Sequence, residues 1–144
     1  MVSGASFGDI LSTNRICPCG GWPAPGTTYG ECCGALHDGS RRALTAEALM
    51  RSRYSAFAVG DPAYLLRTWH ARTRPEDLHL DPEHQWVGLE ILASEDGQAH
   101  HQVGTVTYRA HSRGRDGQER AMTERSRFMR RAGKWVYVDG DMID

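Results

Sequence analysis

Apolar side chains recur with a helical period between Thr45 and Gly60. Thr45 suits the N-cap position, with Glu47 in the first turn, and Gly60 suits the position just past the C-terminal turn. At about 100° per residue, the apolar side chains within about 60° of one direction are those of Ala46, Leu49, Met50, Ala56 and Phe57. The pattern predicts a helix of roughly four turns with one buried face.

Two arginines of this helix point in opposite directions. Arg53 lies at the centre of the apolar stripe, whereas Arg51 lies across the helix. We therefore expect Arg53 to point into the interior, and we expect Arg51→Met to be nearly neutral. A buried charge is costly unless it is paired, so Arg53 calls for a partner.

A second helix is predicted directly afterwards. Asp61 suits its N-cap and Pro62 its first position, and the helix is expected to run to about His70. Its packing stripe comprises Tyr64, Leu65, Thr68 and Trp69. Residues 71–84 are polar and contain two prolines, which favours a connecting loop with at most one short helical turn.

From Trp86 onward the hydrophobic period changes from helical to two. Strands are predicted over residues 86–93, 102–110, 121–130 and 134–138, separated by glycine-containing turns. Helices followed by an antiparallel meander indicate an α+β protein, with helices packed on a curved sheet.

Alternation along the third strand places two polar side chains on its buried face. Met122 and Phe128 mark that face as the core side, and Glu124 and Ser126 share it. Because the inward Arg53 and the inward Glu124 are both costly alone, we predict that they lie within direct contact or one water of each other.

Length and composition indicate a single domain without a membrane span. A chain of 144 residues buries enough surface for a core of its own, and no apolar run approaches the roughly 20 residues of a membrane helix. The first eight residues lack the basic and apolar regions of a secretory signal, so we expect a cytoplasmic protein. The net charge of −1 argues against a nucleic-acid partner, although Arg109, Arg125 and Arg127 form a basic strand pattern.

All four cysteines lie within one segment rich in glycine and proline. They are Cys17, Cys19, Cys32 and Cys33. Disulfides would require an oxidising compartment, and inert thiols would not be expected to cluster in such a loop. A structural Cys₄ zinc site explains both the number and the clustering, with His37 as a possible replacement for one thiolate.

The motifs of the chain resemble those of a known family. Cys17-Pro18-Cys19-Gly20 and Tyr29-Gly30-Glu31-Cys32-Cys33-Gly34 resemble the SEC-C zinc motif, named for the C-terminal tail of the SecA translocation ATPase. The run Leu49-Met50-Arg51-Ser52-Arg53-Tyr54-Ser55-Ala56-Phe57, together with Thr68-Trp69-His70 and Glu124-Arg125-Ser126-Arg127-Phe128, is similar to the YchJ family of bacterial proteins.

This resemblance implies a fold and a domain organisation. The implied fold is the nuclear-transport-factor-2-like (cystatin-like) cone, preceded by a small zinc-bound loop. We accordingly expect an N-terminal tail over residues 1–15, a SEC-C-like zinc motif over 16–40 and the α+β domain over 41–144. The SEC-C resemblance also implies docking of the zinc motif to a protein surface.

Three classes of function remain open. The first is a zinc-stabilised interaction module with a protein partner. The second is a small-molecule binder or enzyme that uses a pocket in the cone, with Arg53, Tyr54, His70, Glu124 and Ser126 as candidate residues. The third is a nucleic-acid binder. No catalytic signature is present, which favours binding over catalysis, and His70 suits a helix cap as well as a general base.

Overall fold

The computed structural model describes residues 13–143 of the chain, so most of the tail expected over residues 1–15 lies outside the described residues. In chain order the elements are η1 (Tyr29–Glu31), α2 (Cys33–His37), α3 (Ala46–Val59), α4 (Pro62–Arg67), β1 (Gln85–Asp96), β2 (Val103–Arg113), β3 (Glu119–Arg131) and β4 (Lys134–Ile143). No helix of this described part is long and apolar enough to cross a membrane.

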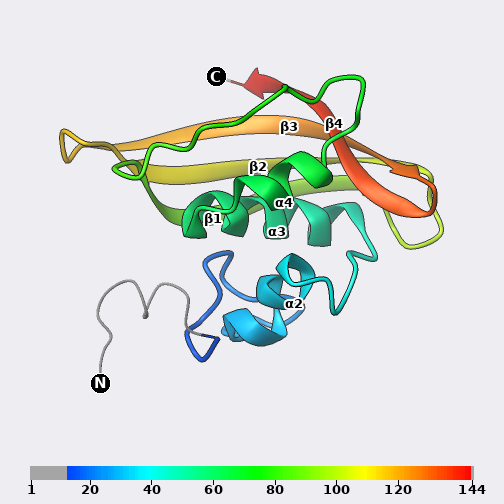
Figure 1. The fold of residues 1–144 in the computed structure, drawn as a ribbon, viewed down its shortest axis with the longest axis horizontal. Coiled ribbons are helices and arrows are strands. Elements are labelled where there is room, and N and C mark those ends of the chain that lie inside the picture. The colour runs from blue at the N-terminus through cyan, green and yellow to red at the C-terminus, as the bar shows by residue number, and fades with distance from the viewer. Residues whose placement is uncertain (1–12, 144) are drawn as a thin grey trace.

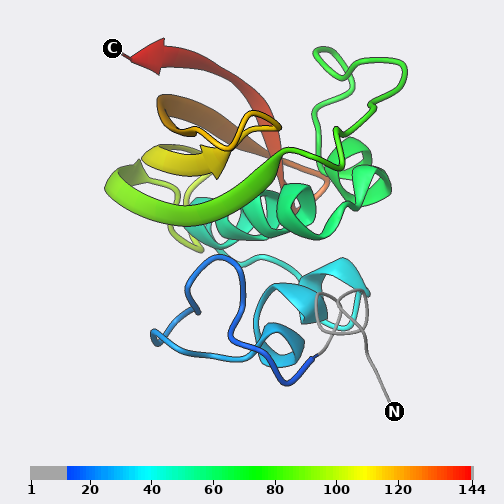
Figure 2. The same ribbon diagram turned by 90° about the vertical axis from the view of Figure 1, so that its left-hand side faces the viewer.

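The four strands form one antiparallel sheet in the order β1-β2-β3-β4. Register shifts interrupt β1 between Trp86 and Gly88 and between Ile91 and Ala93, and a third shift lies beside Phe128 in the pairing of β3 with β4. Such shifts bend a strand and increase its twist. The sheet therefore curves, and Figure 2 shows it wrapping around one side of α3.

Helix α3 occupies the middle of three layers. In both views the sheet lies on one side of α3 and the cysteine-containing motif lies on the other (Figures 1 and 2). The main core accordingly joins the four cysteines to Leu49 and Met50 of α3 and to sheet residues such as Val106 and Phe128. This arrangement explains why α3 is buried on more than the single face that its apolar stripe predicts.

The ends of α3 are as the sequence predicts. The Thr45 hydroxyl accepts a hydrogen bond from the Ala48 N–H at 3.0 Å, and Gly60 adopts the left-handed conformation with a φ of 80°. Asp61 caps α4 in the same way by accepting from the Tyr64 N–H.

Helix α4 is shorter than predicted, because it ends at Arg67 instead of about His70. Beyond Arg67 the backbone pairs with the edge of β4 instead. The Tyr137 N–H donates to the Thr68 carbonyl, and the His70 N–H donates to the Tyr137 carbonyl, each at 2.8 Å. Residues 71–84 then form a loop without a helix. Hydrogen bonds to a distant strand thus override a local pattern that still favours a helix.

The strands are longer than their sequence patterns predict. β4 continues to Ile143 beyond the expected end at Val138, because its backbone keeps pairing with β3 after the apolar alternation stops.

Helix α2, which the sequence pattern does not predict, covers Cys33–His37, in a segment that its glycine and cysteine content marks as a loop. Helices this short depend on their surroundings more than on propensity.

Candidate functional site

The four cysteines converge on one point. Their sulfur atoms all lie within 4.8 Å of one another, with 3.6 Å between the Sγ atoms of Cys19 and Cys32 and 3.9 Å between those of Cys32 and Cys33. None of the four forms a disulfide. A local hairpin-like turn brings Cys17 and Cys19 to the start of α2, since the Cys17 N–H donates to the Thr27 carbonyl at 3.0 Å.

These distances fit a tetrahedral metal site. Zinc–sulfur bonds of about 2.3 Å in a tetrahedron place the sulfur atoms about 3.8 Å apart. The donor set consists of thiols alone, which favours zinc over the hard cations magnesium and calcium. Gly21 permits the tight turn, because its φ of 101° excludes most side chains and a Cβ there would lie 2.5 Å from the Thr27 nitrogen.

The sulfur cluster favours negative charge at one of its members. The pKa of the Cys17 thiol is lowered well below its usual range by hydrogen bonds from Cys19, Cys32 and Cys33. The Ser55 hydroxyl of α3 lies 3.5 Å from the same sulfur. The pKa of Cys33 is raised, first by its hydrogen bonds to Cys17 and the other two cysteines and then by burial. Metal binding requires the thiolates, so a divalent cation suits this cluster.

His37, which the sequence leaves open as a fourth ligand, is engaged elsewhere. Its Nε2–H donates to the Ser52 carbonyl at 2.8 Å, and its Nδ1 accepts from the Tyr29 hydroxyl at 2.6 Å. Burial lowers the pKa of His37, so the ring is held neutral between α2 and α3. Both nitrogens are therefore occupied, and the metal-compatible cluster contains only the four cysteines.

Arg51 corrects one expectation. Its side chain does lie opposite Arg53, but it is mostly buried because the cysteine motif covers it. Its Nε donates to Glu47 at 3.0 Å, its Nη1 donates to the Cys19 carbonyl at 2.9 Å, and its guanidinium lies 5.1 Å from the Trp22 ring. Arg51 thus joins the motif to α3, and we therefore expect its replacement to be destabilising rather than nearly neutral.

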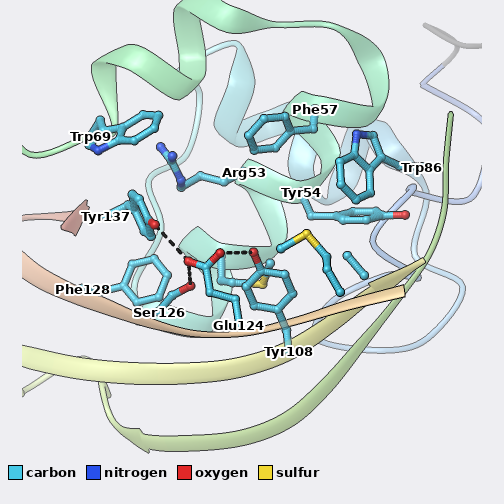
Figure 3. A pocket seen from close by; sticks show the side chains of 13 residues that line it. Arg53, Tyr54, Phe57, Trp69, Trp86, Tyr108, Glu124, Ser126, Phe128 and Tyr137 are labelled. Carbon is cyan, nitrogen blue, oxygen red and sulfur yellow. Dashed lines mark hydrogen bonds between the residues drawn. The ribbon is translucent and has the colours of Figure 1, made fainter. Parts of the chain in front are cut away.

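On the opposite side of α3 lies a cavity of about 320 Å³ between the helices and the concave face of the sheet (Figure 3). Most of its wall is aromatic or apolar. The lining side chains are Met50, Arg53, Tyr54, Phe57, Trp69, Trp86, Tyr108, Ala110, Met122, Glu124, Ser126, Phe128 and Tyr137. Four of the five pocket residues predicted from the sequence are among them.

Arg53 enters this cavity from α3 and is only 6% exposed. Its Nη1 donates to the Leu65 carbonyl at 2.8 Å and to the Thr68 hydroxyl at 2.7 Å. Its guanidinium carbon lies 4.9 Å from the Trp69 ring centre and 4.6 Å from that of Tyr137. Burial lowers the pKa of Arg53 to about 10, so the side chain stays cationic at neutral pH.

Glu124 faces Arg53 from the sheet and is surrounded by hydroxyl groups. Ser126 and Tyr137 each donate to its Oε2 at 2.9 Å, and Tyr108 donates to its Oε1 at 3.4 Å. Burial raises the pKa of both tyrosines, and the negative charge of Glu124 raises it further. The hydroxyls therefore remain donors that hold the carboxylate in place.

Of the two forms of the predicted Arg53–Glu124 pairing, the direct contact is not formed, and a contact through one water stays a prediction. Both side chains are inward, as their helical phase and strand parity predict, but no ion pair joins these two described residues: Arg53 donates to α4 and Glu124 accepts from three hydroxyls. The cause is α4, whose C-terminal carbonyl and Thr68 hydroxyl draw the guanidinium toward the helix end. The two charges stand on opposite walls of the cavity (Figure 3).

The structure also corrects the prediction for His70. It does not line the cavity, because α4 has already ended and the chain turns along the edge of β4. Its ring is buried against Arg131, whose Nη1 lies 2.6 Å from the His70 Nε2. Burial, and then the positive charge of Arg131, lower the pKa of His70. It is neither the predicted helix cap nor a cavity residue.

The sequence pattern missed several residues of the cavity. Trp69 belongs to the predicted helix stripe, and Tyr108 and Tyr137 alternate inward on their strands, but only the fold brings them around the two charges. Gly140 is opposite Ser126 on β4, and a Cβ there would collide with the Glu124 carboxylate. A glycine inside an otherwise regular strand is the signal that indicates such a close approach.

The arginines considered for nucleic-acid binding are largely paired with acids on the sheet surface. Arg127 contacts Asp139 at 2.6 Å and Asp141 at 2.8 Å, and Arg109 lies 3.6 Å from Glu90. Their positive charge is therefore offset locally, which reduces the attraction that a phosphate backbone requires.

Comparison with known proteins identifies relatives of the whole arrangement. A family model described as "YchJ, middle NTF2-like domain" matches residues 45–140. The chain is 56% identical over 128 residues to UPF0225 protein SCO1677 of Streptomyces coelicolor, with 89% of this chain and 96% of that protein covered. A UPF0225 protein of Deinococcus radiodurans is 44% identical over 125 residues, which cover 87% and 88% of the two chains.

Two solved structures share the fold. The solution structure of RPA3114, a SEC-C motif containing protein from Rhodopseudomonas palustris, has a TM-score of 0.74 and 34% identity, and the match covers 89% of this chain and 98% of that one. The crystal structure of a SEC-C motif containing protein from Psychrobacter arcticus has a TM-score of 0.72 and 29% identity, with 93% and 86% covered.

Proposed function

Because the chain belongs to the YchJ family of SEC-C motif proteins with an NTF2-like domain, we propose that it is a small-molecule-binding protein whose N-terminal motif is held by a structural zinc ion. The observation that carries this proposal is the cavity of about 320 Å³, which lies at the lower end of the range of ligand pockets. A mostly aromatic wall with a few convergent polar groups is typical of such pockets.

The zinc ion has a structural role in this proposal. Four thiolates fill a tetrahedral zinc and leave no position open for water or substrate. Cys17, Cys19 and Cys33 are each 2% exposed or less, which keeps the ion away from solvent. The motif thereby supports the side of α3 that faces away from the cavity, through the contacts of Arg51 with the Cys19 carbonyl and of His37 with the Ser52 carbonyl.

The test of ligand binding compares two substitutions on the sheet. Ala110 is buried in the cavity wall, and Ala121 is exposed on the neighbouring strand. Ala110→Phe should fill the cavity, whereas Ala121→Phe leaves it open. We expect the native protein and Ala121→Phe, purified from the native host and denatured, to release the same small molecule in mass spectrometry.

Ala110→Phe should release much less of that molecule while retaining its zinc and its circular dichroism spectrum. A native protein that releases no small molecule, and that binds none of the probes described below, would contradict the proposal.

A second candidate function is docking of the cysteine motif to a protein. A groove of about 260 Å³ beside the motif includes Trp22, Leu44, Arg41 and Arg42, and Leu44 is 65% exposed. Apolar side chains beside two arginines fit an acidic peptide with apolar residues. An alternating Glu/Leu peptide should bind more weakly to Arg42→Glu than to the native protein, whereas the exposed Arg72→Glu should bind as the native protein does. Equal binding by all three proteins would remove this candidate.

A further inference from the structure

The guanidinium of Arg53 has one edge that the protein does not use. Both hydrogen bonds to α4 are made by Nη1, and no described residue accepts from Nε or Nη2. These two nitrogens form the flat fork that binds a carboxylate through two parallel hydrogen bonds. The side chain is buried and lines the cavity, so a bound anion would meet this fork without competition from bulk water.

The opposite wall presents an acceptor that is only partly used. Oε2 of Glu124 accepts two short hydrogen bonds, whereas Oε1 accepts one long bond of 3.4 Å from Tyr108. A carboxylate oxygen has capacity for further donors. Oε1 can therefore accept a hydroxyl or an N–H from a ligand, while the Ser126 and Tyr137 hydroxyls keep the carboxylate in place.

To one side of these two charges the cavity is lined by flat, apolar surfaces (Figure 3). Tyr54 and Phe57 of α3 stand against Trp86 of β1, with ring centres 6.0 Å apart in each pair. Met50, Ala110 and Met122 complete the apolar wall. Aromatic surfaces of this kind favour a planar aromatic body in the ligand.

From these three features we infer that the cavity takes a small aromatic monocarboxylate with a hydrogen-bond donor at the end remote from its carboxylate, an inference that rests on the ligand-binding function proposed above. The carboxylate binds the Nε and Nη2 edge of Arg53. The aromatic body lies among Tyr54, Phe57 and Trp86. The distal donor binds Oε1 of Glu124.

Charge excludes two neighbouring ligand classes. A phosphate dianion would need a second cation, but Arg53 is the only cationic side chain among the cavity residues, and Glu124 would repel the extra charge. An organic cation can pair with Glu124, but it would leave the unused edge of Arg53 without an acceptor and add a second positive charge to the cavity. A monocarboxylate neutralises Arg53 and leaves the Glu124 charge to the hydroxyls that already hold it.

The experiment uses four probes of nearly equal size on the full-length zinc-loaded protein. They are 4-hydroxyphenylacetate, its neutral amide, 4-methoxyphenylacetate without the donor, and tyramine with a cation in place of the acid. Binding is followed by the NMR signals of the indole N–H groups of Trp69 and Trp86, two residues whose side chains line the cavity. We expect 4-hydroxyphenylacetate to bind roughly tenfold or more tightly than its amide and than tyramine, and a few-fold more tightly than 4-methoxyphenylacetate.

Two substitutions assign these preferences to their residues. Arg53→Lys keeps the charge but removes the fork, and it should lose most of the preference for the acid over the amide while binding the amide as the native protein does. Glu124→Gln should reduce the preference for the hydroxyl over the methoxy group. The Arg72→Lys control, on the exposed surface, should change neither ratio.

The two levels of the proposal fail in different ways. If the native protein binds acid and amide equally, or if Arg53→Lys keeps the full preference for the acid, the ligand class is wrong while ligand binding itself stands. If no probe perturbs either indole signal and the purified native protein releases no small molecule, the proposed binding function falls, and the ligand class falls with it.

Discussion

Helix α3 separates two regions of the molecule in which a buried arginine has different hydrogen-bond partners. Arg51 faces the cysteine motif, where a carboxylate, a carbonyl and an aromatic ring surround its guanidinium. Arg53, two residues later, faces the cavity. Only its Nη1 donates hydrogen bonds to the protein, and two aromatic rings flank its guanidinium. The first arginine donates to the protein through both Nε and Nη1, whereas the second donates through Nη1 alone and keeps its Nε and Nη2 edge unused beside an open volume.

Under the proposed function, this difference corresponds to a structural role for Arg51 and a binding role for Arg53. A buried arginine whose hydrogen bonds go to other parts of the same chain joins those parts of the fold. Arg51 does this, because it donates to Glu47 of α3 and to the Cys19 carbonyl of the motif. A buried arginine with unused donors keeps part of its desolvation cost uncompensated, and an anionic ligand offsets that cost. The cysteine side of α3 is therefore interpreted as a support, and the cavity side as the site.

The largest expected effect is the loss of the metal on the cysteine side. We expect about one zinc per chain in the purified protein, and we expect Cys33→Ser to lose it and to lose more than about 3 kcal/mol of unfolding free energy, because zinc binding is coupled to folding of the motif. Elemental analysis and urea unfolding measure both effects.

His37→Gln is the matched control for this prediction, since both ring nitrogens of His37 are engaged away from the cysteines. It should retain about one zinc per chain. The sheet side of the core, which includes Val106, Phe128 and Trp135, should stay folded in Cys33→Ser. Global unfolding on chelation would show that the two regions are not separable.

The second effect concerns the two charges of the cavity. Arg53→Met and Glu124→Gln should each cost roughly 1–3 kcal/mol of unfolding free energy, because each leaves buried hydrogen-bond partners unsatisfied. Since the two side chains do not form a direct ion pair, their coupling in a double-mutant cycle should stay below about 1 kcal/mol. A coupling of several kcal/mol would instead indicate the close pairing, direct or through one water, that the sequence predicts.

The third effect tests the link across the other face. Arg51→Met removes the contacts to Glu47 and the Cys19 carbonyl, and it should cost about 1–2 kcal/mol. It should also speed the transfer of zinc to a chelator without changing probe binding in the cavity. Arg72→Met, exposed on the loop after α4, serves as the control and should change neither quantity.

The smallest effect is a pH dependence on the cysteine side. Burial lowers the pKa of His37 in the folded protein below the value of about 6.5 in the unfolded chain. The unfolded chain therefore binds the proton first as the pH falls below about 6.5, and the unfolding free energy decreases. His37→Gln should flatten this decrease between pH 7 and 5.5, with zinc content checked at each pH. Parallel profiles for the two proteins would exclude His37 as the cause.

The sequence by itself determined the local features of the protein. Thr45 and Gly60 specify both ends of α3, because capping and left-handed conformations depend on single residues. Helical phase and strand parity correctly turned Arg53 and Glu124 inward, because those periods are properties of the backbone. The clustering of four cysteines predicted their convergence, and their motifs predicted the family.

Only the tertiary structure decided how these features meet. It ended α4 at Arg67, since the edge of β4 supplies hydrogen bonds that no local pattern contains. In the folded protein the cysteine motif covers Arg51, and Arg53 donates to the end of α4 instead of to Glu124. Periodicity gives the direction of a side chain but not the partner at the end of that direction. The partner depends on packing between segments distant in sequence, and here that packing gave Arg51 and Arg53 different surroundings on the two sides of α3.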